Sequence, residues 1–208
     1  AYGGGLMYAG WGCTHHAMEE MALMRLVPGM TVMMPADEYE TEQAVRAAAA
    51  IEGPCFISLA GGNVLPDVPE CQRSFEPGKA NVLRYGDAAT VICVGMTVTD
   101  ALRAAEILAE KGLPVRVLEM HTVKPLDADA VLSAAAETPF IITLEEHTVI
   151  GGLGSAVAEV LAEAGASTPL RRLGLQDVFA VMSGSHADVK QRFGITAEAV
   201  VAAVMGEE

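Results

Sequence analysis

Apolar and polar positions recur with two periodicities along the chain, and these predict its secondary structure. Short apolar runs of strand length alternate with stretches in which apolar residues recur every three or four positions, as on one face of a helix. In the first 60 residues this pattern predicts helices at 16–26 and 37–53, and strands at 31–34 and 54–59. Strands and helices that alternate at this spacing indicate βαβ units and a parallel sheet.

The alternation stops between residues 61 and 78 and then resumes. The interrupting stretch holds a Gly-Gly pair and three prolines with little apolar periodicity, so we expect a linker there. Beyond it the pattern again predicts strands and helices in turn. The predicted strands are 80–84, 90–94, 115–119, 140–144 and 170–174, and the predicted helices are 99–111, 127–136, 155–163, 187–193 and 197–205.

These elements divide the chain into two unequal parts. Two strands and two helices are too few to form a sheet buried on both faces, so we expect residues 1–60 to be half of a domain. Residues 61–78 would connect it to a complete α/β domain at 79–208, a three-layer arrangement with a mostly parallel sheet.

Composition and charge narrow the class of protein. A chain with 51% hydrophobic and 19% charged residues is globular, and its net charge of −14 disfavours nucleic acid and anionic membrane surfaces. No apolar run approaches the roughly 18 residues of a membrane span, and no secretory signal is recognisable, so we expect a cytoplasmic protein. The cysteines lack a C-x-x-C spacing, and we expect reduced thiols and no metal site: Cys13, Cys55, Cys71 and Cys93.

A polar cluster follows the predicted strand at 140–144. Glu145, Glu146 and His147 come first, and a glycine turn then opens a helix that Ser155 can cap. Adjacent residues of a strand point to opposite faces, so the two carboxylates cannot readily share one metal ion. We expect them to cap or anchor the glycine turn, or to lie at a subunit contact.

Several short stretches, in a fixed order, carry a resemblance to a known family. They are 12–25 (GCTHHAMEEMALMR), 28–37 (PGMTVMMPAD), 78–80 (GKA), 121–127 (HTVKPLD), 145–147 (EEH), 176–179 (QDVF) and 183–184 (SG). Together they resemble the pyrimidine-binding and C-terminal domains of transketolases, which depend on thiamine diphosphate. The resemblance covers nearly the whole chain and implies the α/β fold already expected.

The resemblance also implies which parts must come from elsewhere. Enzymes of this family use three α/β domains, and the first holds the cofactor's diphosphate through Mg²⁺. This chain has no Gly-Asp-Gly motif for that task, since Gly86-Asp87 continues as Ala88. We therefore expect a C-terminal section that works with an N-terminal transketolase domain or subunit, as a homodimer or heterotetramer. Its own cofactor-binding residues stay unassigned.

Thr14 and His15 form the sharpest candidate site. A histidine near a helix start can hydrogen-bond a substrate hydroxyl or move a proton near neutral pH, although it can equally cap or pack. The resemblance implies that His15 is catalytic and contacts the donor substrate, and that Thr14 and His16 bind substrate.

Three departures from the family pattern bear on the substrate. Trp11 stands where an aspartate is usual, residues 60–63 (AGGN) replace an arginine that binds phosphate, and the stretch 2–5 (YGGG) lacks a histidine. We expect a substrate other than an ordinary sugar phosphate, or a phosphate bound by another chain. Tyr2, Tyr8 and Trp11 would line an apolar pocket, or serve as core or interface aromatics.

Three functions are consistent with these observations. The first is transfer of a two-carbon ketol unit between a ketose and an aldose, with a small sugar-type substrate. The second is the decarboxylating chemistry of 1-deoxyxylulose-5-phosphate synthases or of 2-oxo-acid dehydrogenase β subunits, which would release CO₂ from pyruvate. The third is a non-catalytic dimerisation or assembly module, because the more complete domain shows no obvious catalytic set.

Overall fold

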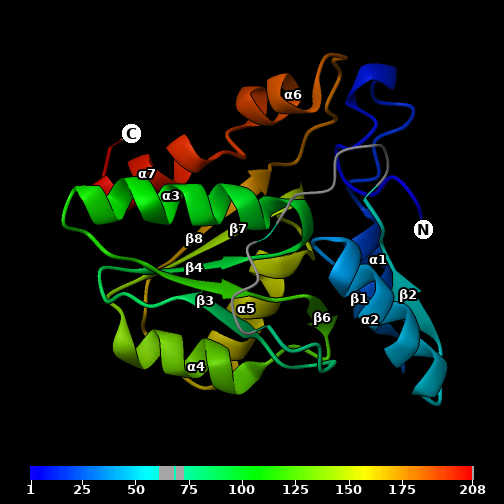
Figure 1. Ribbon diagram of the computed structural model, residues 1–208, viewed down its shortest axis with the longest axis horizontal. Coiled ribbons are helices and arrows are strands. Elements are labelled where there is room, and N and C mark those ends of the chain that lie inside the picture. Colours follow the sequence, from blue (N-terminus) through cyan, green and yellow to red (C-terminus); the bar gives the residue numbers. More distant parts are fainter. Residues whose placement is uncertain (61–67, 69–72, 208) are drawn as a thin grey trace.

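A computed structural model describes residues 1–60, 68 and 73–207 of the chain, and these residues form two β-sheets with helices around them (Figure 1). The larger sheet has five strands in the order β3-β5-β4-β7-β8. Its members are β3 (Asn81–Arg84), β4 (Thr90–Cys93), β5 (Arg116–Glu119), β7 (Ile141–Thr148) and β8 (Leu170–Leu175). All neighbours run parallel except β3, which is antiparallel to β5, so the prediction of a mostly parallel sheet is confirmed.

Helices cover both faces of this sheet and make three layers. On one side lie α3 (Val98–Glu110), α6 (His186–Phe193) and α7 (Ala197–Met205), and on the other α4 (Ala128–Glu137) and α5 (Leu153–Glu163) (Figure 1). Side chains of strand β4 contribute to a hydrophobic core on each face of the sheet. Val91 and Cys93 pack toward α3 and α7, whereas Ile92 packs toward α4 and α5. The strand's period of two is therefore used on both faces, as in other buried parallel sheets.

The smaller sheet has the order β2-β1-β6. Strands β1 (Thr31–Met33) and β2 (Cys55–Ile57) are parallel, and α2 (Glu38–Ala50) connects them. Strand β6 (Thr122–Lys124) pairs antiparallel with β1, although it lies about 90 residues further along the chain. The first 60 residues therefore complete their sheet with a strand from the second part.

Several element boundaries differ from the sequence prediction, each for a local reason. The first helix, α1 (Glu20–Leu26), begins four residues later than expected because Ala17 is held in a bridge to Gly5. Strand β7 extends to Thr148, since its polar end pairs with β8. Strand β6 was not predicted at all, because three residues are too short for a visible apolar period.

Aspartates cap two of the helices. The Asp37 carboxylate accepts a hydrogen bond from the backbone N–H of Glu40 at 2.9 Å, and that of Asp127 accepts one from Ala130 at 3.1 Å. Each satisfies a donor that the first helical turn leaves unpaired.

The predicted linker at 61–78 lies largely outside the described residues, as do Cys71 and the glycines at 61 and 62. Among the residues that are described, Cys13, Cys55 and Cys93 are free thiols. No helix in this part of the chain has both the length and the apolar character to cross a membrane.

Candidate functional site

The candidate histidine lies on a loop whose two ends are joined by backbone hydrogen bonds. The N–H of Gly5 donates to the carbonyl of Ala17 at 3.1 Å, and the N–H of Ala17 donates to the carbonyl of Gly5 at 2.9 Å. We call residues 5–17 the His15 loop. Gly5 has φ +62°, and a Cβ there would lie 2.9 Å from the carbonyl oxygen of Glu146. Only glycine fits this position, so the packing against β7 determines where the His15 loop begins.

Aromatic rings surround His15 on this loop. The ring centroids of Trp11 and His15 are 4.9 Å apart, and Tyr8 meets the same imidazole edge-on at 6.3 Å. Tyr2 lies 6.1 Å from Tyr8. The side chains of Trp11 and Tyr2 are 70% and 64% exposed, so these rings are not core residues of this chain.

The structure brings Thr14 and His15 into direct contact but leaves His16 apart. The hydroxyl of Thr14 lies 2.9 Å from Nδ1 of His15, and both residues are exposed. The ring nitrogens of His16 are both buried, and neither has a hydrogen-bond partner within the part of the chain that the structure describes. Buried polar atoms nearly always find a partner, so the two ring nitrogens of His16 are exceptions among the described residues.

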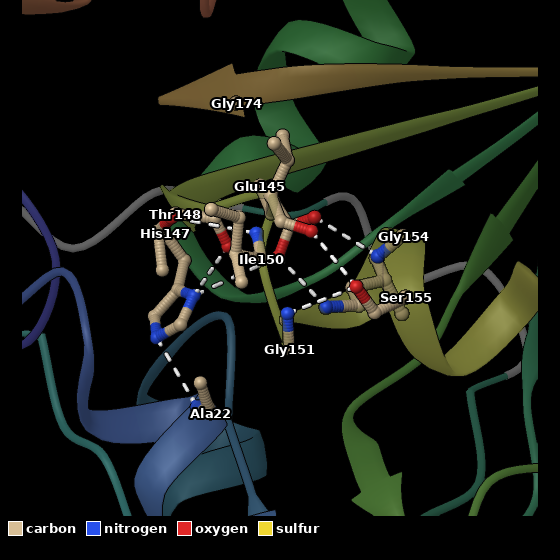
Figure 2. A network of polar contacts seen from close by, with 12 residues as sticks. Ala22, Glu145, His147, Thr148, Ile150, Gly151, Gly154, Ser155 and Gly174 are labelled. Carbon is tan, nitrogen blue, oxygen red and sulfur yellow. Dashed lines mark hydrogen bonds and ion pairs between the residues drawn. The ribbon is translucent and has the colours of Figure 1, made fainter. Parts of the chain in front are cut away.

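His147, on β7 of the five-stranded sheet, forms a hydrogen bond to the start of α1, as Figure 2 shows. Its Nδ1 lies 2.8 Å from the carbonyl oxygen of Thr148, which can only accept, so Nδ1 carries the proton. Its Nε2 then accepts from the backbone N–H of Ala22, in the first turn of α1, at 3.3 Å. Burial lowers the pKa of His147 to about 4, which keeps the imidazole neutral and able to accept this bond at neutral pH.

Glu145 anchors the glycine turn, as expected. Its two carboxylate oxygens accept from the backbone N–H groups of Leu153 at 2.7 Å and Gly154 at 2.9 Å (Figure 2). Burial raises the pKa of Glu145 to about 7, although the two hydrogen bonds act to lower it. The prediction that Ser155 caps this helix is wrong: α5 begins two residues earlier, and the Ser155 hydroxyl instead donates to the carbonyl of Val149 at 2.9 Å.

Glu146 points to the other face of β7, as the alternation of a strand requires. It accepts from Nε2 of His186 at 2.8 Å and lies 3.3 Å from Nζ of Lys190, which is also paired with Asp100. Burial opposes the ionisation of Glu146, but His186 and Lys190 outweigh it and hold its pKa below the usual value. The two adjacent carboxylates therefore have separate structural roles. Within the described residues there is no group of three or more His, Cys, Asp or Glu side chains that could hold a metal ion.

A cleft opens where the carboxyl ends of strands from both sheets meet. Its lining includes Ser58 after β2, Gly95 after β4, and Glu146 near the end of β7. Gly4 also lines it, directly before the His15 loop, and the Ser58 hydroxyl donates to the carboxylate of Glu20. Burial raises the pKa of Glu20. The carboxyl edge of parallel strands is where binding sites usually form in α/β proteins.

Sequence reasoning missed a second buried polar cluster, which joins the two parts of the chain. Arg73 forms an ion pair with Asp37 at 2.5 Å and lies 3.8 Å from the fully buried Glu40. Burial and the nearby carboxylate of Glu119 raise the pKa of Glu40. The only sequence signal was the pair of acids at the start of α2, because their partners lie far away along the chain.

Comparison with known proteins gives a consistent result. A family model described as the transketolase C-terminal domain matches residues 78–200, and one described as the transketolase pyrimidine binding domain matches residues 2–65. A putative transketolase C-terminal section of Methanocaldococcus jannaschii is 36% identical over 94% of this chain and 61% of its own length. A 6-deoxy-6-sulfo-D-fructose transketolase subunit of Clostridium sp. is 42% identical over 92% of this chain and 59% of its own length.

A solved structure is similar over almost the whole chain. It is described as a split gene transketolase in the form of an inactive β4 tetramer, with a TM-score of 0.88 and 40% identity. The match covers 99% of this chain and 65% of that one. This chain thus spans roughly three fifths of the length of the relatives that it matches.

Proposed function

This chain belongs to the transketolase family, and on that premise we propose that it is the C-terminal part, or subunit, of an enzyme that transfers a two-carbon ketol unit from a ketose to an aldose. Residues 1–60 would be half of the pyrimidine-binding domain, 61–78 the linker, and 79–208 the C-terminal domain. Thiamine diphosphate is the expected cofactor, as in the family.

One observation carries the proposal at the level of the site: His15 is exposed on a loop that is held at both ends. The Gly5–Ala17 bridge closes the loop, and Thr148 donates to the carbonyl of Met18 at 2.9 Å just beyond it. A fixed and accessible imidazole can hydrogen-bond a hydroxyl of the donor and move its proton near neutral pH. Thr14 would orient that ring. His16 would also bind substrate, as the family resemblance implies.

The described residues lack the groups that the diphosphate end of the cofactor requires. The described part offers neither a three-ligand metal group nor an uncommitted cation close by, because Arg25 and Lys190 are already paired. We therefore assign the diphosphate and Mg²⁺ to the N-terminal domain or subunit. When bound, the cofactor supplies the nucleophilic carbon that a ketol transfer needs.

We further propose that activity requires that N-terminal partner, in a homodimer or heterotetramer. The solved relative described as inactive consists of β chains alone, which supports this requirement. The net charge of −14 favours a small-molecule substrate over nucleic acid or anionic membranes. The family of metabolic enzymes supports the proposal of a cytoplasmic location.

The test is substitution of His15 in the assembled protein. We expect His15→Ala to lower kcat for ketol transfer by about 100-fold, the range for loss of a general acid or base, with thiamine diphosphate affinity changed less than about threefold. His15→Asn keeps hydrogen bonding but not proton transfer, and should recover binding of the ketose more than turnover. Tyr85→Ala, at an exposed tyrosine after β3, is the control.

The same assays separate the other functions. If the assembled protein neither binds thiamine diphosphate nor responds to His15→Ala, the proposal is wrong and an assembly role is favoured. Release of CO₂ from pyruvate would point instead to the decarboxylating members of the superfamily.

A further inference from the structure

The residues around His15 are aromatic, and this composition indicates which class of substrate they can bind. The rings of Trp11 and Tyr8 contact the imidazole at centroid distances of 4.9 and 6.3 Å, and Tyr2 contacts Tyr8 at 6.1 Å; we call these four residues the His15 aromatic patch. Trp11 is the most exposed of the three aromatics, at 70%, although tryptophan is a residue that chains usually bury. Large exposed rings that meet at a candidate catalytic group are typical of a binding surface.

Among the described residues, no lysine or arginine belongs to the segments that form the patch or contact its loop. The first basic residue in the sequence is Arg25, and it is bound to Glu159 and to the carbonyl of Gly151. The segment 175–189 contacts the His15 loop through the Gly184 N–H and the Ala9 carbonyl, and it also contains no lysine or arginine.

Two further cations of the described residues are held in buried ion pairs. Lys190 lies between Glu146 and Asp100, and Arg73 is paired with Asp37. Recognition of a phosphate or sulfonate depends on charge-assisted hydrogen bonds, most often from arginine. An anionic group placed on this patch would lose water and gain no lysine or arginine partner from residues 1–24 or 175–189.

We propose that the His15 aromatic patch binds the uncharged aryl or alkyl group of an aldehyde acceptor, so that the enzyme prefers such aldehydes to aldose phosphates. The inference rests on the proposed function and names its substrate class. The indole and phenol faces would bury the apolar group while their polar edges stay in water.

The reaction this implies needs no oxidant or reductant. The bond between C2 and C3 of the ketose breaks, the C3 hydroxyl gives up its proton to become the carbonyl, and an aldose shortened by two carbons is released. A new carbon–carbon bond joins the ketol unit to the aldehyde carbon, and the former aldehyde oxygen takes up a proton. His15 is the group on this chain placed to exchange that proton.

The first experiment compares acceptors in the assembled protein. We expect kcat/KM for benzaldehyde to exceed that for glyceraldehyde 3-phosphate, with the same ketose donor. Trp11→Ala should lower kcat/KM for benzaldehyde by about tenfold and that for glycolaldehyde, which has no apolar group, by less than about threefold. Tyr85→Ala, which removes another exposed ring, should change neither.

The second experiment detects binding without turnover. Trp11 is the single tryptophan of the sequence, so fluorotryptophan labelling gives one ¹⁹F signal from this chain, which Trp11→Phe identifies by its loss. We expect benzyl alcohol to shift that signal in a saturable way and glycerol 3-phosphate to leave it in place.

Each outcome bears on a different claim. A shift with benzyl alcohol in a protein that transfers no ketol unit would support the patch and refute the proposed function. Preference for the phosphorylated acceptor, or equal losses with every acceptor in Trp11→Ala, would refute acceptor binding by the patch. Ketol transfer in the same assays would still support the proposed function. The absence of any shift with benzyl alcohol would also overturn the patch.

Discussion

At the scale of single residues, burial decides what the polar cluster after β7 can do. Glu145 and His147 are almost fully buried and face backbone donors, so each acts as an acceptor at a helix N-terminus. Glu145 caps α5 from its own strand, whereas His147 caps α1 from the other part of the chain. Neither role needs a substrate, and His15 differs from both in being exposed.

The role of His147 predicts a pH dependence of stability. Its pKa is about 4 in the folded chain and 6.5 in the reference state, so the unfolded chain binds the extra proton between these values. The contribution of His147 to the free energy of unfolding is therefore complete above pH 6.5 and is lost as the pH falls through 4. The total loss is about 3 kcal/mol. Replacing His147 by Gln keeps an acceptor but removes the titration.

We expect urea denaturation at several pH values from 4 to 7 to give a steeper decline for the wild type than for His147→Gln. His121, whose pKa burial also lowers to about 4, is common to both proteins and cancels in the comparison. Parallel stability curves for the two proteins would show that His147 does not carry this dependence.

At the scale of elements, α1 is positioned by the glycine turn that follows β7. The turn contacts the helix at the Ala22 N–H through His147 and at Arg25, which donates to the carbonyl of Gly151 at 2.5 Å. Lys124 of β6 holds the helix's other end by donating to the carbonyls of Arg25 and Val27. A helix of seven residues is too short to be stable alone, so these contacts fix where it begins and ends.

Two glycines allow the contact between the turn and α1 to be measured apart from backbone strain. Gly151 and Gly112 have nearly equal φ, +76° and +75°, but a Cβ at Gly151 would lie 2.9 Å from the Cβ of Ala22, whereas one at Gly112 would meet nothing within 4 Å. Gly112→Ala should therefore cost only the left-handed strain, about 1 kcal/mol. Gly151→Ala should cost about 1–3 kcal/mol more, because a packed contact must shift.

Thermal or urea denaturation of the two variants checks this difference. In the Ala22→Gly background, Gly151→Ala should lose most of its extra cost, since the opposing methyl group is gone; Ala22→Gly alone is the reference, because glycine in a helix itself costs about 0.5–1 kcal/mol. Equal destabilisation in Gly112→Ala and Gly151→Ala would mean that the turn does not press on α1.

At the scale of the whole molecule, the two parts of the chain share one sheet and one buried polar cluster. Strand β6 pairs with β1, and the Met34 N–H donates to the carbonyl of His121 at 2.8 Å. The Arg73–Asp37 ion pair lies beside Glu40, close enough to Glu119 of β5 to influence its ionisation. A sheet whose strands come from both parts cannot lose one part without exposing the other.

Hydrogen exchange tests this coupling. We expect the amides of Thr31–Met33 to exchange within about tenfold of the rate for Thr90–Cys93, because both strands open only when the shared structure unfolds. Mass spectrometry of peptides from the full protein gives both rates. Exchange at Thr31–Met33 that is faster by several orders of magnitude would show that the first sheet opens independently.

Much of the architecture could be predicted from the sequence, because it depends on local periodicity. The β4 run Thr90–Cys93 and the stripe of α3 are readable as buried strand and amphipathic helix, and Asp37 and Asp127 are readable as caps. The motif around Thr14 and His15 marked the candidate site, and the alternation of β7 correctly separated Glu145 from Glu146.

The sequence by itself thus determined the class of fold, the sheet's interior and the candidate histidine, since each depends on residues within a few positions of one another. Only the tertiary structure decided where α1 begins, that β6 completes the first sheet, and that His147 caps a helix 125 residues away. It also placed the rings of Trp11 and Tyr8 around His15. These features depend on chain closure and burial, which bring distant groups together and which no local pattern encodes.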